Sequence, residues 1–228
     1  IFDLCAAVPR GSVDMILCDL PYGTTACSWD TVIPFAPMWA AFKRVTKPRG
    51  AIVLTASQPF TSALVMSNVG MFRYAWVWDK AMPVGHLNAK IMPLRQHEDV
   101  VVFCGETPAY YPQMLPRLVR RVDKRTGKTY QGGGQQTYGT YQSVSGEYDD
   151  YYPRSIITHS NADQTDKLHP TQKPVALFSY LIRTYTRPGE LVFDPCVGSG
   201  TTAIAAREEG RRFIVGDSSL EYVEVARK

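Results

Sequence analysis

The segment Asp-Leu-Pro-Tyr-Gly at residues 19–23 constrains the fold more than any other stretch of the chain. It follows a nearly continuous apolar run at residues 13–18, and a proline and a glycine close it. A short apolar run that ends in this way is typical of a strand buried on both faces of a parallel sheet. We therefore predict that residues 19–22 lie just past the carboxyl end of a strand, where open α/β sheets bind their ligands.

The residue types of this segment suit the recognition of an amino group. The Asp19 carboxylate only accepts hydrogen bonds. Pro21 fixes its own φ and restricts Leu20, so the Leu20 carbonyl is held in one direction. Tyr22 offers a flat face for stacking. Two acceptors beside an aromatic ring can hold a planar molecule by an exocyclic NH2 group, and the alternative is a plain strand-ending turn with a capping aspartate.

A second motif, Val-Phe-Asp-Pro-Cys-Val-Gly-Ser-Gly-Thr-Thr at residues 192–202, joins a predicted strand (191–193) to a predicted helix (201–209). Its glycines do not have the dinucleotide spacing, and no Gly-Lys-Ser/Thr follows, so it is a poor phosphate cradle. Gly198 and Gly200 instead permit close backbone approach by a ligand without a phosphate. The next predicted strand (213–216) leads to Asp217, at about the distance where such folds place a ribose-binding acid.

These motifs resemble those of the amino-group DNA methyltransferases. Residues 19–22 resemble the Asp-Pro-Pro-Tyr motif of that family, residues 192–202 resemble its S-adenosylmethionine loop, and His-Pro-Thr-Gln-Lys-Pro at residues 169–174 matches the segment before that loop. The catalytic motif precedes the cofactor motif, which is the circularly permuted order of the β group. The resemblance implies a catalytic set of Asp19, Leu20, Pro21 and Tyr22. It implies that S-adenosylmethionine is bound by His169, Thr171, Gln172, Lys173, Pro174, Asp194, Pro195, Cys196, Gly198, Ser199, Gly200, Thr201, Thr202 and Asp217.

The resemblance and the pattern together predict an α/β fold: a Rossmann-like class I methyltransferase sheet, circularly permuted, with helices on both faces and a target-recognition insert. We expect a catalytic half at residues 1–104, the insert at 105–168 and the cofactor-binding half at 169–228. The family adds one antiparallel edge strand, which we place at residues 98–103. Helices are predicted at residues 37–46, 57–69 and 173–186, with Trp39, Phe42 and Val45 on the buried face of the first.

The predicted insert has no sustained apolar period, and a connection this long is either functional or disordered. Its cations gather near its start and lie among aromatic residues, a combination that suits phosphates and exposed bases. The alternative is a solvated loop with charges for solubility. Because the family recognises its target sequence at this place, we expect DNA contacts from Arg117, Arg120, Arg121, Lys124, Arg125 and Lys128.

Other polar and aromatic residues are open to two interpretations. Thr24, Thr25 and Trp29 follow the catalytic turn. Either they line the pocket, or Trp29 is packed against the protein and the two threonines are solvated. By resemblance, residues 79–94 flank the base pocket. The charged residues at 95–99 either take part in function or form a surface salt-bridge cluster, and the second interpretation is the favoured one.

The function that we predict is transfer of a methyl group from S-adenosylmethionine to adenine N6 of a base flipped out of double-stranded DNA. Cytosine N4 methylation is the nearest alternative, because the same acceptors fit either amine; in the family, Asp at the first motif position leans to adenine and Ser to cytosine. An RNA or protein-glutamine methyltransferase and an inactive DNA-binding relative are further alternatives. The motifs require no metal.

Composition and charge set the remaining bounds. The 228 residues carry a formal net charge of +4, which permits a polyanionic partner without demanding one. The five cysteines have no Cys-x-x-Cys spacing, which argues for reduced thiols in a cytosol. The resemblance implies a cytoplasmic protein that is bacterial or phage-encoded. No signal peptide or bilayer-spanning run is visible, and a homodimer and a cognate restriction enzyme stay open as partners. By resemblance, we expect a Gly-Asp pair of the cofactor pocket to precede Ile1.

Overall fold

The computed structural model describes residues 1–25, 27, 30–123, 129–131, 140–142, 146–161, 172–219 and 222–224. The chain divides into two compact units, one formed by Ile1–Tyr111 with Arg154–Lys228 and the other by Pro112–Pro153. The first unit contains the residues of the catalytic and cofactor motifs, and the second lies within the predicted insert. No helix among the described residues is long and apolar enough to cross a membrane.

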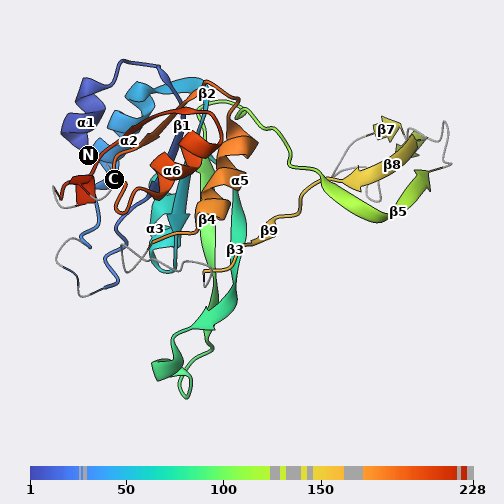
Figure 1. Cartoon of the computed structure of the whole chain (residues 1–228), viewed down its shortest axis with the longest axis horizontal. Coiled ribbons are helices and arrows are strands. Elements are labelled where there is room, and N and C mark those ends of the chain that lie inside the picture. The colour runs from blue at the N-terminus through green and yellow to red at the C-terminus, as the bar shows by residue number, and fades with distance from the viewer. Residues whose placement is uncertain are drawn as a thin grey trace. The chain divides into compact units, whose positions relative to one another are not determined.

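Seven strands of the described chain form the sheet of the first unit, in the order β11-β10-β1-β2-β4-β3-β9. Their neighbouring pairs are parallel except that β4 runs antiparallel to both β2 and β3. The mostly parallel sheet is the one that the sequence predicts (Figure 1). The strands are β1 (Val13–Asp19), β2 (Thr46–Ala56), β3 (Phe72–Val84), β4 (Arg95–Phe103), β9 (Ile156–Thr158), β10 (Leu191–Asp194) and β11 (Arg212–Val215).

The predicted edge position of the strand at residues 98–103 is wrong. This strand, β4, is antiparallel as expected, but it lies between β2 and β3, and β9 forms the edge. Its residues Val100, Val101 and Val102 are completely buried. Such a run of consecutive apolar residues is typical of an interior strand covered on both faces, and this signal points to the interior position.

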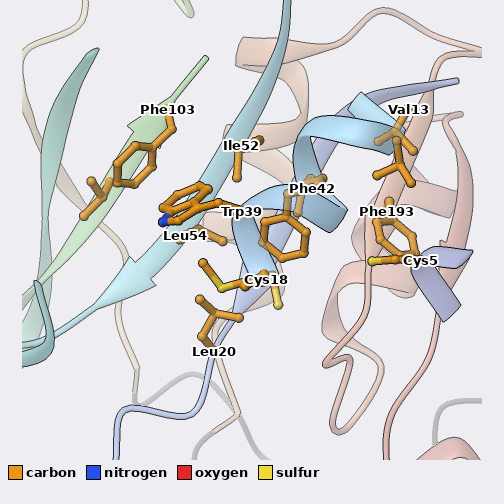
Figure 2. Packing of buried hydrophobic residues seen from close by; sticks show 14 of the residues in the cluster. Cys5, Val13, Cys18, Leu20, Trp39, Phe42, Ile52, Leu54, Phe103 and Phe193 are labelled. Atoms are coloured by element: carbon orange, nitrogen blue, oxygen red, sulfur yellow. The ribbon is translucent and has the colours of Figure 1, made fainter. Parts of the chain in front are cut away.

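Helices cover both faces of the sheet and bury two separate apolar clusters. Successive side chains of a strand point to opposite faces, so Ile16 and Cys18 of β1 enter one cluster while Met15 and Leu17 enter the other. The first cluster, part of which Figure 2 shows, packs against α1 (Phe2–Ala7), α2 (Phe35–Val45) and α3 (Phe60–Ser67). The second packs against α5 (Val175–Tyr185) and α6 (Thr201–Glu208).

The predicted helices agree with α2, α3, α5 and α6 to within a few residues, and α2 buries Trp39, Phe42 and Val45 as predicted. Helix α1 is an addition that the sequence pattern did not indicate. Strand β2 begins at Thr46, directly after α2, although the predicted helix included that residue. The pairing of Val13 with Thr46, followed by a register shift, explains how the chain continues through Pro48 into the sheet.

After two neighbouring strands of the sheet, β1 and β10, the chain continues on opposite faces of the sheet. β1 and β10 are parallel neighbours, with Ile16 paired to Phe193. From β1 the chain continues through α2 on one face, whereas from β10 it continues through α6 on the other face. Such a reversal opens a crevice at the carboxyl ends of the two strands. Asp19 and Asp194, the last residues of β1 and β10, lie there.

The second unit consists of short antiparallel pairs. β5 (Leu115–Asp123) pairs with β8 (Gly146–Tyr151), and β6 (Thr129–Gln131) pairs with β7 (Thr140–Gln142). The predicted cations Arg117, Arg120 and Arg121 belong to β5. Lys124, Arg125 and Lys128 lie outside the described residues.

Candidate active site

A cavity of about 580 Å³ opens at the crevice between the carboxyl ends of β1 and β10. It brings together the catalytic turn, the glycine loop and residues from β3 and β4. Pro174 and Gly200 do not line the cavity, and the predicted His169 and Thr171 lie outside the described part of the chain. The predicted site residues that line it are Asp19, Leu20, Pro21, Tyr22, Gln172, Lys173, Asp194, Pro195, Cys196, Gly198, Ser199, Thr201, Thr202 and Asp217.

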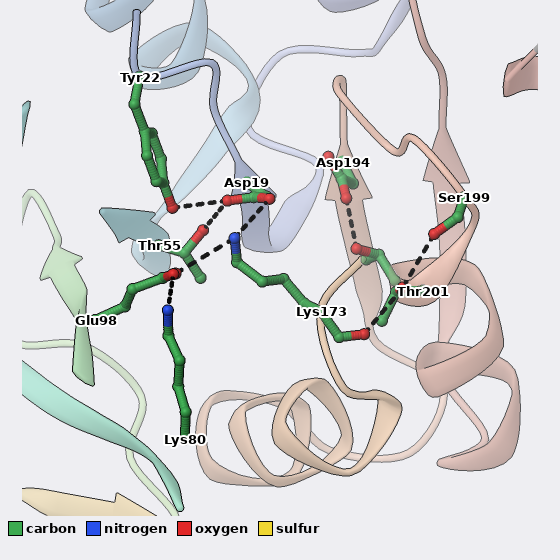
Figure 3. A network of polar contacts seen from close by, with 10 residues as sticks. Asp19, Tyr22, Thr55, Lys80, Glu98, Lys173, Asp194, Ser199 and Thr201 are labelled. Atoms are coloured by element: carbon green, nitrogen blue, oxygen red, sulfur yellow. Dashed lines mark hydrogen bonds and ion pairs between the residues drawn. The ribbon is translucent and has the colours of Figure 1, made fainter. Parts of the chain in front are cut away.

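Asp19 is held by three side chains from three different segments (Figure 3). Its Oδ1 accepts hydrogen bonds from the Tyr22 hydroxyl, at 2.8 Å, and from the Thr55 hydroxyl of β2. Its Oδ2 accepts a hydrogen bond from the Lys173 ammonium, at 2.9 Å. Thr55 stands opposite Asp19 in the β1–β2 register, so the parallel pairing itself places this hydroxyl. The carboxylate is therefore fixed in direction at the floor of the cavity.

Tyr22 lies against an aromatic ring of α3. Its ring stacks on Phe60, with 5.1 Å between the ring centres and 23° between the planes. The pKa of Tyr22 is raised well above its ordinary value, mainly by burial and to a lesser extent by the nearby carboxylates of Asp19 and Glu98. The phenol therefore stays protonated and donates to Asp19, while its ring is supported from one side by Phe60.

Lys173 lies at the catalytic end of the cavity. It precedes Pro174, the N-cap of α5, and its carbonyl accepts a hydrogen bond from Thr201 of the glycine loop, at 3.3 Å. Burial alone would lower the pKa of Lys173, but the carboxylates of Asp19 and Glu98 outweigh that effect and raise the pKa. The side chain is thus an ammonium, and it contacts Asp19 although the resemblance placed Lys173 among the cofactor-binding residues.

Glu98 lies in the cavity, although only the less favoured interpretation of the charged residues at 95–99 gave it a place in the site. The favoured surface salt-bridge cluster is wrong for this residue, because the Glu98 side chain is only 15% exposed and lines the cavity. It pairs with Lys80 at 2.5 Å and with Lys173 at 3.4 Å. Because β4 is antiparallel, its amino end lies at the edge where the parallel strands have their carboxyl ends. The antiparallel direction expected for this strand therefore already implied that Glu98, at its amino end, lies at the edge of the site.

The loop after the catalytic turn is organised by Asp30, a residue that the sequence motifs did not indicate. Its carboxylate accepts hydrogen bonds from the backbone N–H groups of Gly23, Thr24 and Thr25, at 2.7–2.9 Å. Burial alone would raise the pKa of Asp30, but these hydrogen bonds outweigh it and lower the pKa. Thr24 and Thr25 line the cavity, as one interpretation predicted, and Trp29 lies outside the described residues.

Asp194 holds the glycine loop through two hydrogen bonds. Its Oδ1 accepts a hydrogen bond from the Cys196 N–H at 3.0 Å, and its Oδ2 accepts one from the Thr202 hydroxyl. Burial raises the pKa of Asp194 to about 7, against the opposing effect of these two donors. The carboxyl group therefore joins the beginning of the loop to the first turn of α6.

The upper side of the glycine loop is open to a ligand. Gly198 has a φ of +52°, and a Cβ built there would meet nothing within 4 Å. Its N–H donates to Asp217 Oδ2 at 3.0 Å, and Asp217 Oδ1 accepts from the Ser219 N–H at the same distance. A carboxylate has about four acceptor positions, so Asp217 retains acceptors for hydroxyl groups of a ligand. The open space next to Gly198 and the carboxylate of Asp217 fit the adenosine part of S-adenosylmethionine.

Comparison with known proteins agrees with this geometry. Residues 13–228 match the model of the N6/N4 DNA methylase family, described as a DNA methylase. The chain belongs to this family. The Type II methyltransferase M2.DpnII of Streptococcus pneumoniae is 50% identical over all of this chain and 85% of its own length. The Type II methyltransferase M.HpaI of Haemophilus parainfluenzae is 27% identical over 96% of this chain and 68% of its own length.

Solved structures confirm the class I methyltransferase fold of this methylase. The M1.HpyAVI–SAM complex superposes with a TM-score of 0.61 at 22% identity, covering 95% of this chain and 88% of that one. The cytosine-N4-specific PvuII DNA methyltransferase has a TM-score of 0.67 at 17% identity, covering 99% and 82%. The methylase is thus an S-adenosylmethionine-dependent DNA methyltransferase of the N6/N4 family.

In the second unit, the basic strand lies beside an acidic one. Arg120 of β5 pairs with Glu147, at 2.6 Å, and with Asp149, at 3.1 Å, both of β8. The Arg117 side chain donates to the Asp150 carbonyl at 2.7 Å and lies over the Tyr151 ring. Arg117 and Arg120 therefore already have partners within their own unit. DNA contact by these residues stays a prediction.

Proposed function

We propose that this methylase transfers the methyl group to N6 of adenine in double-stranded DNA. The observation that carries the proposal is the place of Asp19: it ends β1 in the same cavity as the glycine loop, beside the supported ring of Tyr22. The carboxylate is an acceptor for one N–H of an exocyclic amine, and the Leu20 carbonyl is an acceptor for the other. The preference for adenine over cytosine rests on aspartate, and not serine, at the first motif position.

The catalytic residues act by holding the amine in one orientation. Phe60 covers one face of Tyr22, so the target base stacks on the other face. An amine whose two hydrogens are both held is favoured in a tetrahedral arrangement, which directs its lone pair away from the two acceptors. The positive charge that develops on the nitrogen is then stabilised by Asp19. S-adenosylmethionine, when bound, supplies the electrophilic methyl group.

The cofactor is assigned to the glycine loop. The proposed contacts are the ribose hydroxyls with Asp217 and the adenosine part with the open backbone at Gly198, for which the space and the acceptors are present. Asp194 and Thr202 keep the loop in shape from below. Alignment of the amine nitrogen with the methyl group then contributes through proximity and orientation.

The decisive test is to methylate a random-sequence duplex and to identify the modified bases by mass spectrometry and sequencing. We expect N6-methyladenine within one recurrent sequence. Methylated cytosine with unmodified adenine would replace this proposal by cytosine N4 methylation, the specificity of the PvuII DNA methyltransferase. Because the relatives are Type II methyltransferases, we propose that the recurrent sequence is also the site of a cognate restriction enzyme.

DNA contact by the second unit has its own test. Neutralising the predicted cations at residues 117–128 should weaken binding to all duplexes and flatten its salt dependence by about one unit of slope per lost phosphate contact. Since Arg120 is paired with two acids, we expect its single substitution to have less effect than that of Arg117. Arg10→Gln removes an exposed charge of the first unit and serves as the control. An unchanged slope would assign the cluster to solubility.

A further inference from the structure

Four charged side chains of alternating sign line the catalytic end of the cavity. The order is Lys80, Glu98, Lys173 and Asp19, with nitrogen–oxygen distances of 2.5, 3.4 and 2.9 Å between successive members (Figure 3). The Lys80 and Lys173 side chains are 8% and 9% exposed. Buried charges persist when they are paired, so this charge cluster is a single electrostatic unit.

The position of Lys173 opposes the chemistry assigned to Asp19. Asp19 Oδ1 already accepts from two hydroxyl groups, so Oδ2 is the oxygen left for an incoming amine, and the Lys173 ammonium is bound to it. An ammonium at that oxygen would also lie next to the nitrogen that becomes positive during transfer. Like charges at such short range repel in a partly buried site. Although Oδ2 keeps one further acceptor position, this repulsion favours a reacting arrangement in which the ammonium has left Oδ2.

Glu98 offers a second place for that ammonium. Its Oε1 is held by Lys80, which lies in turn 5.5 Å from the centre of the Trp78 ring. Its Oε2 is buried and has no hydrogen-bond donor among the described residues, although the Lys173 nitrogen lies 3.4 Å away as an ion-pair partner. Glu98 is thus anchored through one oxygen and available through the other, on the side of Lys173.

We propose that Lys173 is handed from Asp19 to Glu98 when the amine of the target base enters. The amine N–H replaces the lysine N–H at Asp19 Oδ2, and the ammonium forms its hydrogen bond with Glu98 Oε2. No proton is transferred in this exchange. Each buried charge keeps a partner throughout. Glu98 then forms ion pairs with both Lys80 and Lys173, and Oδ2 of Asp19 accepts a hydrogen bond from the amine. Lys173 and Glu98 are positioning residues in this scheme, and they act through Asp19.

The exchange gives the site a selectivity that fixed acceptors would lack. Only a group that donates hydrogen bonds can take the place of the lysine, so a base that presents no donor to Asp19 leaves the lysine where it is. The inference rests on the proposed function only in requiring such an amine, and it holds equally for adenine N6 and cytosine N4. It is therefore tested by counting labelled methyl groups transferred to DNA, whichever base receives them.

The first experiment is a double-mutant cycle on single-turnover methyl transfer. Glu98→Gln keeps the size of the side chain and removes the charge that receives the lysine, so we expect the transfer rate to fall about tenfold or more. The dissociation constant for S-adenosylmethionine should stay within about twofold, because Glu98 acts on the amine end of the cavity and not on the glycine loop. Asp99→Asn, an acid-to-amide change at the next position, whose carboxylate accepts from Thr61, is the control and should keep the wild-type rate.

The cycle is closed with Lys173→Met. In the Lys173→Met background no ammonium can move to Glu98, so adding Glu98→Gln should change the transfer rate by less than about twofold. Equal effects of Glu98→Gln in both backgrounds, or a wild-type rate for Glu98→Gln alone, would overturn the hand-over. Failure of the adenine assignment would look different, since it changes the methylated base and not the coupling between the two residues.

A second measurement covers the case in which Lys173→Met has no residual activity. A crystal structure with S-adenosylhomocysteine and a duplex containing the target base gives the two distances from the Lys173 nitrogen. The hand-over predicts a hydrogen bond to Glu98 Oε2 and none to Asp19. A lysine that stays on Asp19 while the base occupies the site would overturn it.

Discussion

Two aspartates end neighbouring parallel strands of this methylase, and they differ in solvent exposure and in the charge of their partners. Asp19 and Asp194 close β1 and β10, each after an apolar run and each shortly before a proline. The Asp19 side chain is 23% exposed and has an ammonium at 2.9 Å. Asp194 is 2% exposed and forms none of the ion pairs found among the described residues; its partners are a hydroxyl group and a backbone N–H.

The two aspartates show that the place of a carboxyl group at the end of a strand does not determine its role; the neighbouring side chains do. Both strand ends deliver an acid to the same crevice, but only Asp19 has the ammonium of Lys173 as a partner, and through Lys173 it is linked to Glu98 of β4 and Lys80 of β3. The other is enclosed by the turn into α6, where burial raises its pKa to about 7. We therefore assign the chemical step to Asp19 and the shape of the cofactor loop to Asp194.

The largest effect is expected from Asp19→Ala. The substitution removes an acceptor that matters most when the amine nitrogen becomes positive, so its cost falls on methyl transfer. By analogy with loss of one preorganised charge-stabilising group, the single-turnover rate should drop about a hundredfold to a thousandfold. The measurement uses saturating enzyme and cofactor. Wild-type transfer, or a loss of DNA affinity alone, would make Asp19 a structural cap like Asp194.

Asp194→Asn tests the other half of the comparison through pH. The folded-state pKa of about 7 lies above the unfolded value near 3.8, so between these values the folded protein holds a proton that the unfolded chain has released. The contribution of Asp194 to stability is therefore complete below about pH 4 and is lost as the pH rises through 7. The asparagine variant lacks this loss, and its stability relative to wild type should rise by on the order of 3 kcal/mol.

Urea unfolding of both proteins at several values between pH 4.5 and pH 8 measures this difference. Other titrating groups are common to both proteins and cancel in it. The pH-independent offset, which includes the lost hydrogen bond to Thr202, does not enter the comparison. Two stability curves that stay parallel over this range would mean that Asp194 titrates normally.

The sequence predicted one half of this site better than the other. The strand–turn motifs around Asp19 and Asp194 are local, so the mostly parallel sheet and the helices on both faces could be read from apolar runs and turn residues. Glu98 and Lys80 come from strands whose neighbours depend on long-range pairing, and Arg95–Phe103 is interior only because β3 and β9 cover it. Pairing of this kind leaves no local signal beyond the run of buried valines.

Asp217→Ala should have a smaller effect, confined to the cofactor. It removes the acceptor proposed for the ribose hydroxyls, and loss of hydrogen bonds to a charged group costs about 1.5–3 kcal/mol of binding free energy. Asp217→Asn keeps an oxygen for the Gly198 N–H and separates loss of charge from loss of the turn. Calorimetry with S-adenosylmethionine gives both values. Unchanged affinity in the alanine variant would remove Asp217 from the site.

The smallest effect on chemistry is expected from Leu20→Pro, which gives Asp19 the directly following proline that Asp194 already has. The backbone carbonyl at position 20 is retained, and a residue before proline favours the extended conformation that Asp19 already has in β1. Single-turnover transfer should therefore stay within about twofold of wild type. Stability should fall by about 1 kcal/mol, because the Leu20 side chain is 4% exposed in the first apolar cluster. If transfer falls as far as in Asp19→Ala, the Leu20 side chain, and not its carbonyl, shapes the catalytic turn, and the two strand ends differ in backbone as well as in charge.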